Sequence, residues 1–530
     1  MAETEPIQLV WYTLCAILVA TIVVKLKLMK SSSTSALHGL NLPPGPWSIP
    51  VLGHMQFLIG ALPHQALRRL AQQHGPVMLL RLGHVPTLVL SSAEAARAVM
   101  KASPHAAADA FASRPVYAAA DIFTYGGENI SFARHDSRHW KALRKLCTME
   151  LLSPGRVRSF RPVRDQEAAR LVRSVAGAGG AAVNVSERLK VMMNDVIMRV
   201  SVGDRCRQRA GYLEELDRML DLMSGFNLTD LFPASRLARV LGGGSLKAAW
   251  AVHQRMHGIM EDMIRDHKSA MDSELEELEA APASSAGNDA DEREEILTTL
   301  LRFQRDGGIG GIAITNENVA GVLFDVFSAG SETTATTAIW AMSELMRSPR
   351  IMAVAQSEVR RVLHGKNAVT EADIDSGRLP YLEMVIKETF RLHPPVPLLL
   401  PRLCAVSSKV MGYDVPAGTT VFVNVSAIGK DEDSWTADAG DFRPERFETE
   451  AVDYGGTDFR FLPGGAGRRM CPGMMFGVSN IIIALACLLY HFDWKVPGGE
   501  SPEKLDMAES YGITARRKTE LLLEATPFVR

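Results

Sequence analysis

A glycine-rich loop that presents a single cysteine near the C-terminus constrains this chain more than any other feature. The loop covers residues 461–473, reads Phe-Leu-Pro-Gly-Gly-Ala-Gly-Arg-Arg-Met-Cys-Pro-Gly, and is followed by an apolar predicted helix, Val478 to Leu489. Glycines let the backbone approach a flat ligand closely and adopt positive φ. Amides around Cys471 and at the start of the next helix can donate hydrogen bonds to sulfur, which stabilises a thiolate.

The loop therefore predicts that Cys471 is a ligand to a bound group. Two other interpretations remain open. A glycine-rich loop can enclose an incidental buried cysteine, and glycine-rich loops also bind phosphate. The phosphate interpretation fits less well, because no Gly-Lys-Ser/Thr sequence follows the glycines.

A long apolar stretch, Val319 to Met346, predicts a buried helix that crosses the whole protein. Its middle reads Ala-Gly-Ser-Glu-Thr-Thr over residues 329–334. A buried acid beside a hydroxyl is costly without partners, and Ser or Thr can bend a helix by bonding back to a carbonyl. We expect a local opening with room for water or dioxygen beside a cofactor. A solvent-filled kink without chemistry is the alternative.

A third, weaker signal is the pair Glu388 and Arg391, which share one face of a predicted helix over residues 380–392. Such pairs usually lie on a solvated surface. The segment Phe-Arg-Pro-Glu-Arg-Phe over 442–447 supplies another arginine, Arg446.

Composition excludes some classes of protein. The 530 residues are 47% hydrophobic and 22% charged, which is ample for a large core. The net charge of -2 argues against nucleic-acid binding, which usually requires a strongly basic surface. The six cysteines show no Cys-x-x-Cys or zinc-ligand spacing, so a reducing compartment is expected.

The N-terminus predicts a membrane anchor. Residues 7–24 carry no charge and approach the length of a bilayer-spanning helix. Acidic residues precede this run and lysines follow it, the reverse of a secretory signal, so the body should face the cytosol. A cleaved signal peptide and a buried core helix are the alternatives. Residues 31–50 are polar and then Pro-rich, which predicts a stiff spacer.

The rest of the chain predicts one large α-rich domain with small β-sheets, an α+β fold, because it shows no internal repeat and no clear boundary within residues 42–530. The pattern is mostly helical over 137–270, with breaks expected at the glycines of 176–180 and 242–244, and a surface loop expected over 272–295. Further helices are expected over 64–73, 93–101 and 351–363, and short strands over 77–82 and 87–91.

The order and spacing of these segments resemble a cytochrome P450 over nearly the whole chain. Pro394-Pro395, Pro-Glu-Arg-Phe over 444–447 and Gly-Arg-Arg-Met-Cys-Pro-Gly over 467–473 resemble plant members of the endoplasmic reticulum that modify specialised metabolites. The resemblance implies a haem-thiolate fold with a membrane anchor over 1–30, a hinge over 31–50 and a single catalytic haem domain over 51–530.

The resemblance also implies residue roles. Cys471 would be the axial thiolate of haem b, and Thr333 and Glu332 would deliver protons for oxygen activation. Glu388, Arg391 and Arg446 would form a structural triad behind the haem. The expected haem-propionate partners are Trp140, Arg144, Arg402 and Arg469. Substrate contacts are expected from residues 116–130, Asp325, Ala329, Val396, Leu398, Leu399, the region of Tyr511 and Ile513.

Three departures from the family pattern affect these expectations. Most members carry an aromatic residue at the position of Gly464, so the sulfur should have less cover and the haem potential can differ. The segment 101–110 is longer than usual, and residues 133–137 replace a tighter aromatic turn before Trp140. The last two flank a substrate-facing region.

The implied activity is a monooxygenase of the endoplasmic-reticulum membrane. It would take NADPH electrons from NADPH-cytochrome P450 reductase and insert one oxygen atom of O2 into a small apolar substrate, with a terpenoid as the first expectation. A non-oxygenating isomerase or dehydratase with the same haem is the enzymatic alternative, and the presence of Thr333 argues against it. A membrane-anchored haem carrier or sensor is the non-enzymatic alternative.

Overall fold

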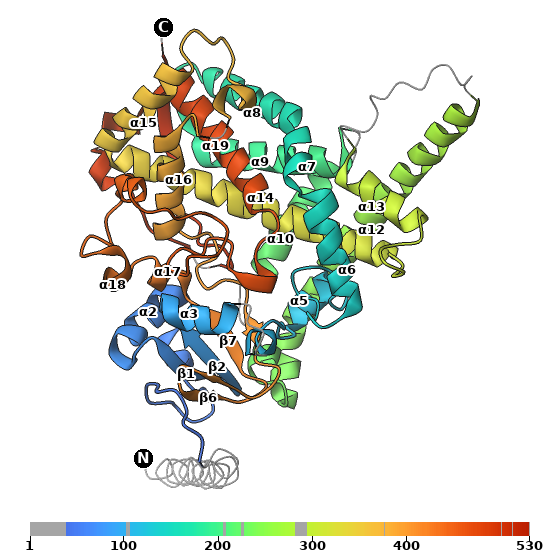
Figure 1. The fold of residues 1–530 in the computed structure, drawn as a ribbon, viewed down its shortest axis with the longest axis vertical. Helices are drawn as coiled ribbons and strands as arrows, with labels where there is room; N and C mark the ends of the chain where they lie inside the picture. Colours follow the sequence, from blue (N-terminus) through green and yellow to red (C-terminus); the bar gives the residue numbers. More distant parts are fainter. Residues whose placement is uncertain are drawn as a thin grey trace, which may run out of the picture.

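The computed structural model describes residues 39–101, 107–204, 208–223, 227–280, 294–375, 377–499, 501–510 and 512–528. The predicted membrane helix, Tyr511 and the middle of the 101–110 segment lie outside these ranges. The predicted α+β class with small sheets is confirmed: helices form most of the body, and a sheet region with α2 (Pro63–His74) and α3 (Ala93–Met100) lies at one end (Figure 1).

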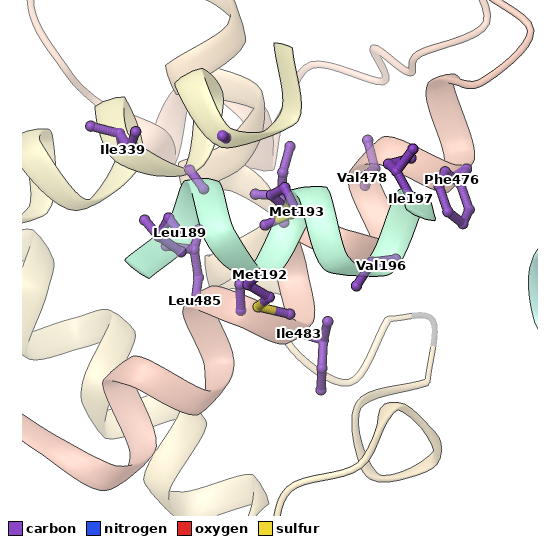
Figure 2. Close-up of a cluster of buried hydrophobic side chains, with 14 of the residues drawn as sticks. Leu189, Met192, Met193, Val196, Ile197, Ile339, Phe476, Val478, Ile483 and Leu485 are labelled. Atoms are coloured by element: carbon purple, nitrogen blue, oxygen red, sulfur yellow. The ribbon is translucent and has the colours of Figure 1, made fainter. Parts of the chain in front are cut away.

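The helical part is built around α14 (Asn316–Arg347), which runs through the centre of the protein. Thr315 and Asn318 form a capping box that starts this helix. Helix α9 (Val185–Val202) and helix α19 (Met474–His491) both pack against α14. Figure 2 shows the buried cluster that these helices share. Its labelled members are Leu189, Met192, Met193, Val196 and Ile197 of α9, Phe476, Val478, Ile483 and Leu485 of α19, and Ile339 of α14.

The largest sheet has four strands in the order β1-β2-β7-β4, with bounds Val77–Leu82, Val85–Leu90, Thr420–Val423 and Arg402–Leu403. β1 and β2 form an antiparallel hairpin, and β7 runs parallel to β2. A second sheet has the order β3-β9-β8 (Ala182–Asn184, Leu522–Pro527, Phe492–Lys495), and β5 (Ser408–Val410) pairs with β6 (Tyr413–Val415). The sheet thus places β7 next to the N-terminal hairpin and β4, which follows the Pro394-Pro395 segment, at the outer edge beyond β7.

Most of the remaining helices belong to the helical part. The other helices are α4 (Ala107–Ala110), α5 (Ala118–Phe123), α6 (Arg138–Leu146), α7 (Pro154–Ser159), α8 (Arg161–Ala176), α10 (Arg209–Met223), α11 (Leu228–Leu231), α12 (Arg236–Ala280), α13 (Ile296–Arg305), α15 (Pro349–Val362), α16 (Pro380–Leu392), α17 (Val425–Ile428) and α18 (Glu432–Trp435). Short helical turns are η1 (Met55–Phe57), η2 (Cys147–Leu151), η4 (Glu371–Ile374), η5 (Pro444–Glu448), η6 (Gly467–Arg469), η7 (Pro497–Gly499) and η8 (Pro502–Lys504).

Two predictions about α12 are wrong. The helix continues through Gly242, Gly243 and Gly244, and it extends to Ala280 into the stretch expected to be a loop. Each glycine costs a helix only about 1 kcal/mol, and a side chain at Gly242 would meet Asn227 Oδ1 at 2.7 Å. The small residue therefore lets α11 approach α12. Glutamate, leucine and alanine in the last turns are good helix formers, and this end of α12 projects from the body (Figure 1).

The opening expected in the centre of α14 is also absent, because the helix is continuous through residues 329–334. The predicted back-bonds are present instead. Thr333 Oγ1 donates to the Ala329 carbonyl and Thr334 Oγ1 to the Gly330 carbonyl, each at 2.6 Å. The two hydroxyl groups thus have hydrogen-bond acceptors within the helix, and these bonds do not interrupt it.

The described part of the Pro-rich hinge lies against the body. The Asn41 amide donates to Asp414 Oδ2 at 2.9 Å, and the Leu79 amide donates to the Pro44 carbonyl at 3.0 Å. A side chain at Gly45 would meet the Leu79 carbonyl at 2.5 Å, so the absence of one allows this approach. The extended segment is therefore fixed to β1 and β6.

Among the described helices, Met474–His491 alone is long and apolar enough to cross a bilayer by length and composition, and 72% of it is buried in the protein. Its position between α14, α8 and α15 makes it a core helix. Cys147, Cys404, Cys471 and Cys487, the cysteines that the structure describes, are free thiols.

Candidate active site

The loop before α19 holds Cys471 in a fixed position. The Cys471 amide donates to the Gly464 carbonyl at 2.8 Å, and Arg144 donates to the Met470 carbonyl. Gly467 has a φ of +69°, and a side chain there would meet the Met100 carbonyl at 2.2 Å. Only glycine tolerates both this conformation and this approach, so the loop packs directly on α3.

The Cys471 side chain is accessible, yet it lies deep in the protein. Burial raises the pKa of the Cys471 thiol, while the Gly473 amide and the charge of Arg144 lower it. The residue is therefore accessible on one side while protein surrounds it densely on the others. The amide and the guanidinium are groups that would stabilise a thiolate once a cation binds it.

The centre of α14 faces the same region. Helix α14 is buried along most of its length, but Ala329 is exposed and Thr333 is half-buried. Helices α14 and α19 touch where a side chain at Gly477 would meet Thr334 Oγ1 at 3.4 Å. Thr333 and Cys471 are both close in sequence to this contact between α14 and α19. The two helices therefore bring residues 329–334 and the cysteine loop together.

Four arginines form a mutually repelling cluster beside the cysteine loop. Burial lowers the pKa of Arg402 to about 10 and that of Arg469 to about 9, and in Arg469 the charges of Arg402 and Arg144 add to this effect. Burial and the same three arginines hold the pKa of Arg114 well below its ordinary value. Asp325 is the carboxylate whose charge raises the pKa of both Arg114 and Arg469.

This cluster fits the haem that the sequence resemblance implies. Buried charges need partners of opposite sign, and four guanidinium groups with one nearby carboxylate leave three positive charges uncompensated. The two propionates of haem would supply two negative charges for these guanidinium groups, while a Cys471 thiolate would compensate the positive charge of the ferric haem core. Guanidinium groups suit carboxylates because they donate two parallel hydrogen bonds.

Trp140 contributes to the cluster mainly through its ring. The Arg469 guanidinium lies over the indole with 4.4 Å between its central carbon and the ring centroid. The indole N–H donates to the Ile130 carbonyl at 3.0 Å. Trp140 therefore packs against Arg469, and its direct contact with a propionate stays a prediction.

The expected triad contacts are present. Arg391 donates to both oxygens of Glu388 at 2.7 Å, and Arg446 Nε donates to Glu388 Oε1 at 2.9 Å. All three side chains are buried. The surface-pair interpretation of the Glu388–Arg391 spacing is excluded by this burial.

Glu332 does not share the surroundings of Thr333. Its carboxylate forms an ion pair with Arg516 and accepts hydrogen bonds from Thr336 and Thr514 at 3.2 Å each. The Arg516 side chain is 32% exposed, so this pair connects the helix centre to solvent. Consecutive helix residues point about 100° apart, which separates the acid from the hydroxyl.

The residues predicted to contact substrate lie mostly around one cavity. The cavity has a volume of about 180 Å3 and a mainly apolar wall. Leu399 in this wall has a φ of +51°, and its side chain approaches Gly465 of the cysteine loop. A strained leucine between cavity and loop is the kind of outlier that concentrates at functional sites. Val396, Leu398, Leu399 and Ile513 line the cavity, together with Tyr117, Ala119 and Ala120 from the predicted 116–130 segment.

Asp325 does not fulfil the expectation of a substrate contact. Both its carboxylate oxygens accept hydrogen bonds from residues 129–131, and it is absent from the described lining of the cavity. Ala329 is also absent from that lining, but it remains exposed on α14. The sequence could not show that the Asp325 carboxylate is bound by hydrogen-bond donors of residues 129–131.

Comparison with known proteins decides the family. The family model for cytochrome P450 matches residues 43–523. The chain belongs to the cytochrome P450 family. This P450 is 43% identical over 510 residues to zealexin A1 synthase of Zea mays, covering 96% of this chain and 97% of that protein. It is 44% identical over 497 residues to ent-isokaurene C2/C3-hydroxylase of Oryza sativa subsp. japonica, covering 92% and 93%.

Solved structures agree on the fold. A zebrafish cytochrome P450 determined with progesterone has a TM-score of 0.72 at 24% identity, covering 88% of this chain and all of that chain. The predicted family and function class are confirmed: the protein is a plant specialised-metabolism P450, a haem-thiolate monooxygenase with haem b as cofactor. Such an enzyme uses an apolar substrate, O2 and a redox partner.

Arg114 is the site residue that the sequence reasoning missed. It stands in the P450 segment Phe-Ala-Ser-Arg-Pro over 111–115, whose residues gave no sign of the cluster. Its guanidinium donates to the carbonyls of Ser131, Leu400 and Pro401 at 2.7–3.0 Å. The signal in the sequence was limited to an arginine between small residues and a proline, because such a charge in a buried segment needs a partner.

Two sulfur-containing residues, Cys471 and Met474, pack closely around Gly464 in this P450. A side chain at Gly464 would meet Cys471 Cβ and Met474 Sδ, both at 3.1 Å. Met474 is buried. The thioether therefore occupies space beside the cysteine loop and provides cover that glycine alone would not.

Proposed function

We propose that this P450 oxygenates an apolar terpenoid with electrons from NADPH-cytochrome P450 reductase at the endoplasmic-reticulum membrane. The observation that carries this proposal is the cavity wall, in which Val396, Leu398 and Ile513 present branched aliphatic side chains and Leu399 approaches Gly465 of the cysteine loop. The names of its plant relatives, which include hydroxylases of ent-isokaurene and ent-cassadiene, support a terpenoid. The membrane assignment rests on the uncharged run of residues 7–24.

The proposed arrangement along the chain is an anchor over residues 1–30, a hinge over 31–50 and a haem domain over 51–530. The fixed contacts of Asn41 and Pro44 support a hinge that holds the body at a set angle to the membrane. The acidic-to-basic order across the apolar run supports a single pass with the body in the cytosol.

The roles proposed for the site residues follow from their positions. Haem bound through Cys471 supplies the activation of O2 and the transfer of one oxygen atom to carbon. Arg114, Arg144, Arg402 and Arg469 receive the propionates, and Trp140 supports Arg469. The apolar cavity orients the substrate and excludes water from it.

Microsomes that contain the full chain offer a direct test of the activity. The full chain is co-expressed with NADPH-cytochrome P450 reductase, and microsomes receive cyclic terpene hydrocarbons, with aromatic polyphenols as the comparison class. We expect a terpene product that contains one additional oxygen, requires NADPH and carries label from 18O2. A rearranged or dehydrated product without label indicates the isomerase alternative. Conversion of the polyphenols alone contradicts the terpenoid assignment.

Proton supply is assigned to Thr333 and Glu332. Thr333 Oγ1 holds a proton on the accessible face of α14, and Glu332 passes protons from solvent when Arg516 releases its carboxylate. Replacement of Glu332 by glutamine keeps the shape and removes the ionisable group. Because a positioned acid or base typically contributes about 100-fold or more, we expect Glu332→Gln to lower product formation by about 100-fold.

The measurement for this variant is product formed per NADPH consumed, with hydrogen peroxide quantified in the same reaction. Oxidation of NADPH should continue while product falls, since electron delivery does not need the carboxylate. Glu317→Gln, an exposed position in the first turn of the same helix, is the matched control and should match the native enzyme. Native product yield from Glu332→Gln would place the proton route elsewhere.

A further inference from the structure

We propose that Asp325 is a positioning residue that holds the haem-binding arginines in place through the peptide groups of residues 129–131. This proposal rests on the propionate role assigned above to Arg114 and Arg469, and it is independent of the substrate. Asp325 lies on α14, whereas these arginines come from distant segments of the chain, and the 129–131 segment is the connection between them.

The N–H side of the segment is bound to the carboxylate. Asp325 Oδ2 accepts hydrogen bonds from the amides of Ile130 at 2.7 Å and Ser131 at 3.1 Å. Asp325 Oδ1 accepts from Asn129 Nδ2 at 2.8 Å and Ser131 Oγ at 2.6 Å. Four donors on one carboxylate fix the backbone of three consecutive residues relative to α14.

The carbonyl side of the same segment is bound to the cationic cluster. The Ile130 carbonyl accepts from Arg469 Nη1 and from Trp140 Nε1, both at 3.0 Å. The Ser131 carbonyl accepts from Arg114 Nε at 3.0 Å. The peptide unit between Ile130 and Ser131 therefore has the carboxylate at its N–H and the Arg469 guanidinium at its C=O, an arrangement in which hydrogen bonds polarise and strengthen each other.

The segment is seated closely on α14. A side chain at Gly321 would meet the Glu128 carbonyl at 2.9 Å and Asn129 Cβ at 3.3 Å. Asn318 Nδ2 donates to Glu128 Oε2 at 2.7 Å. Asn318, Gly321 and Asp325 follow helical spacing and lie on one face of α14. A shift of Asp325 therefore displaces the segment as a unit.

The charge of Asp325 complements this geometry. Burial raises its pKa to about 6, and the four hydrogen bonds limit that rise, so the carboxylate is ionised at neutral pH. Its charge raises the pKa of Arg114 and of Arg469, against the mutual repulsion of the arginines. Asp325 thus orients the guanidinium groups and partly compensates their charge.

The experiment measures haem loss from the substrate-free ferric holoenzyme to excess apomyoglobin. Asp325→Ala removes all four acceptor bonds, and we expect haem loss to accelerate by about tenfold or more, as when outer-shell partners of a bound group are removed. Asp325→Asn keeps one acceptor oxygen and most of the shape but loses the charge, so it should restore part of the retention. Asn318→Ala removes a neighbouring tether of the same segment and part of the α14 cap, so it reports general loosening and should accelerate haem loss much less than Asp325→Ala.

A double-mutant cycle separates positioning from general loosening of the fold. If Asp325 acts through Arg114, the effects of Asp325→Ala and Arg114→Gln on haem loss are strongly non-additive. Native haem retention in Asp325→Ala overturns the proposal. Two other results also overturn it. One is equal acceleration of haem loss in Asp325→Ala and Asn318→Ala at matched melting temperatures, and the other is strict additivity in the double-mutant cycle. None of these outcomes depends on the terpenoid assignment, since no substrate is present.

Discussion

Replacement of Cys471 by serine is expected to abolish both the spectrum of thiolate-ligated haem and the oxygenation activity. The Cys471 amide donates to the Gly464 carbonyl at 2.8 Å, the residue is accessible, and the charge of Arg144 lowers the pKa of its thiol. Serine keeps the backbone contacts, but its oxygen cannot replace the electron-rich sulfur ligand. The reduced protein is examined with carbon monoxide, in the same preparation that is assayed for product.

Cys147 provides the control for this experiment. It lies close enough to Arg144 and Cys471 for their charges to affect its pKa, but burial raises the pKa of its thiol to about 12. A thiol that stays protonated is a poor metal ligand. Cys147→Ala should therefore keep the thiolate spectrum and the activity. A thiolate spectrum that survives in Cys471→Ser would contradict the assignment of the ligand.

Replacement of Arg391 by alanine is expected to remove most of the folded protein. Arg391 donates to both oxygens of Glu388 and to the carbonyls of Ala439 and Asp441 at 2.6 and 3.0 Å. Loss of one partner from a buried ion pair costs about 3–5 kcal/mol, and a whole domain has only about 5–15 kcal/mol of stability. The yield of soluble haem-containing protein and its melting temperature measure the effect.

Arg218 supplies the comparison for the triad. Its half-exposed guanidinium pairs with the exposed Glu214 and with Glu215, and the buried Glu215 keeps a second partner in Arg255 when Arg218 is lost. Because exposed pairs contribute about 0–1 kcal/mol, Arg218→Ala should melt close to the native protein. Arg391→Lys keeps the charge but loses the planar guanidinium group, so its melting temperature should lie between those of Arg391→Ala and the native protein. A native melting temperature for Arg391→Ala would show that the triad does not stabilise the fold.

Local patterns predicted the helices well where the pattern itself decides the structure. The bounds expected for α16, residues 380–392, are those observed, because apolar spacing and a proline at the start define them. The spacing of Glu388 and Arg391 also gave their pairing, but the partner Arg446 came only from the family resemblance. In α12, glycines that disfavour a helix locally were outweighed by packing against α11, which the local sequence does not reveal.

The parts of the site that sequence reasoning missed depend on contacts between distant residues. The partners of Asp325 are nearly two hundred positions away, so a carboxylate in an apolar helix gave the signal of a polar substrate contact. Arg114 joins the cluster only because the fold brings it to Arg402 and Arg469. Neither placement follows from periodicity or motif spacing, both of which describe neighbours along the chain.

The hydrogen bonds from Arg114 to the backbone of the cavity wall affect how the substrate range of such enzymes can change. Its guanidinium holds the segment from Val396 to Pro401 by the backbone carbonyls of Leu400 and Pro401. Backbone carbonyls are present whatever the side chain is. Mutations at Val396 and Leu398 can therefore remodel the cavity while the path of the chain stays fixed. Substrate range can evolve in this segment without a loss of cofactor binding.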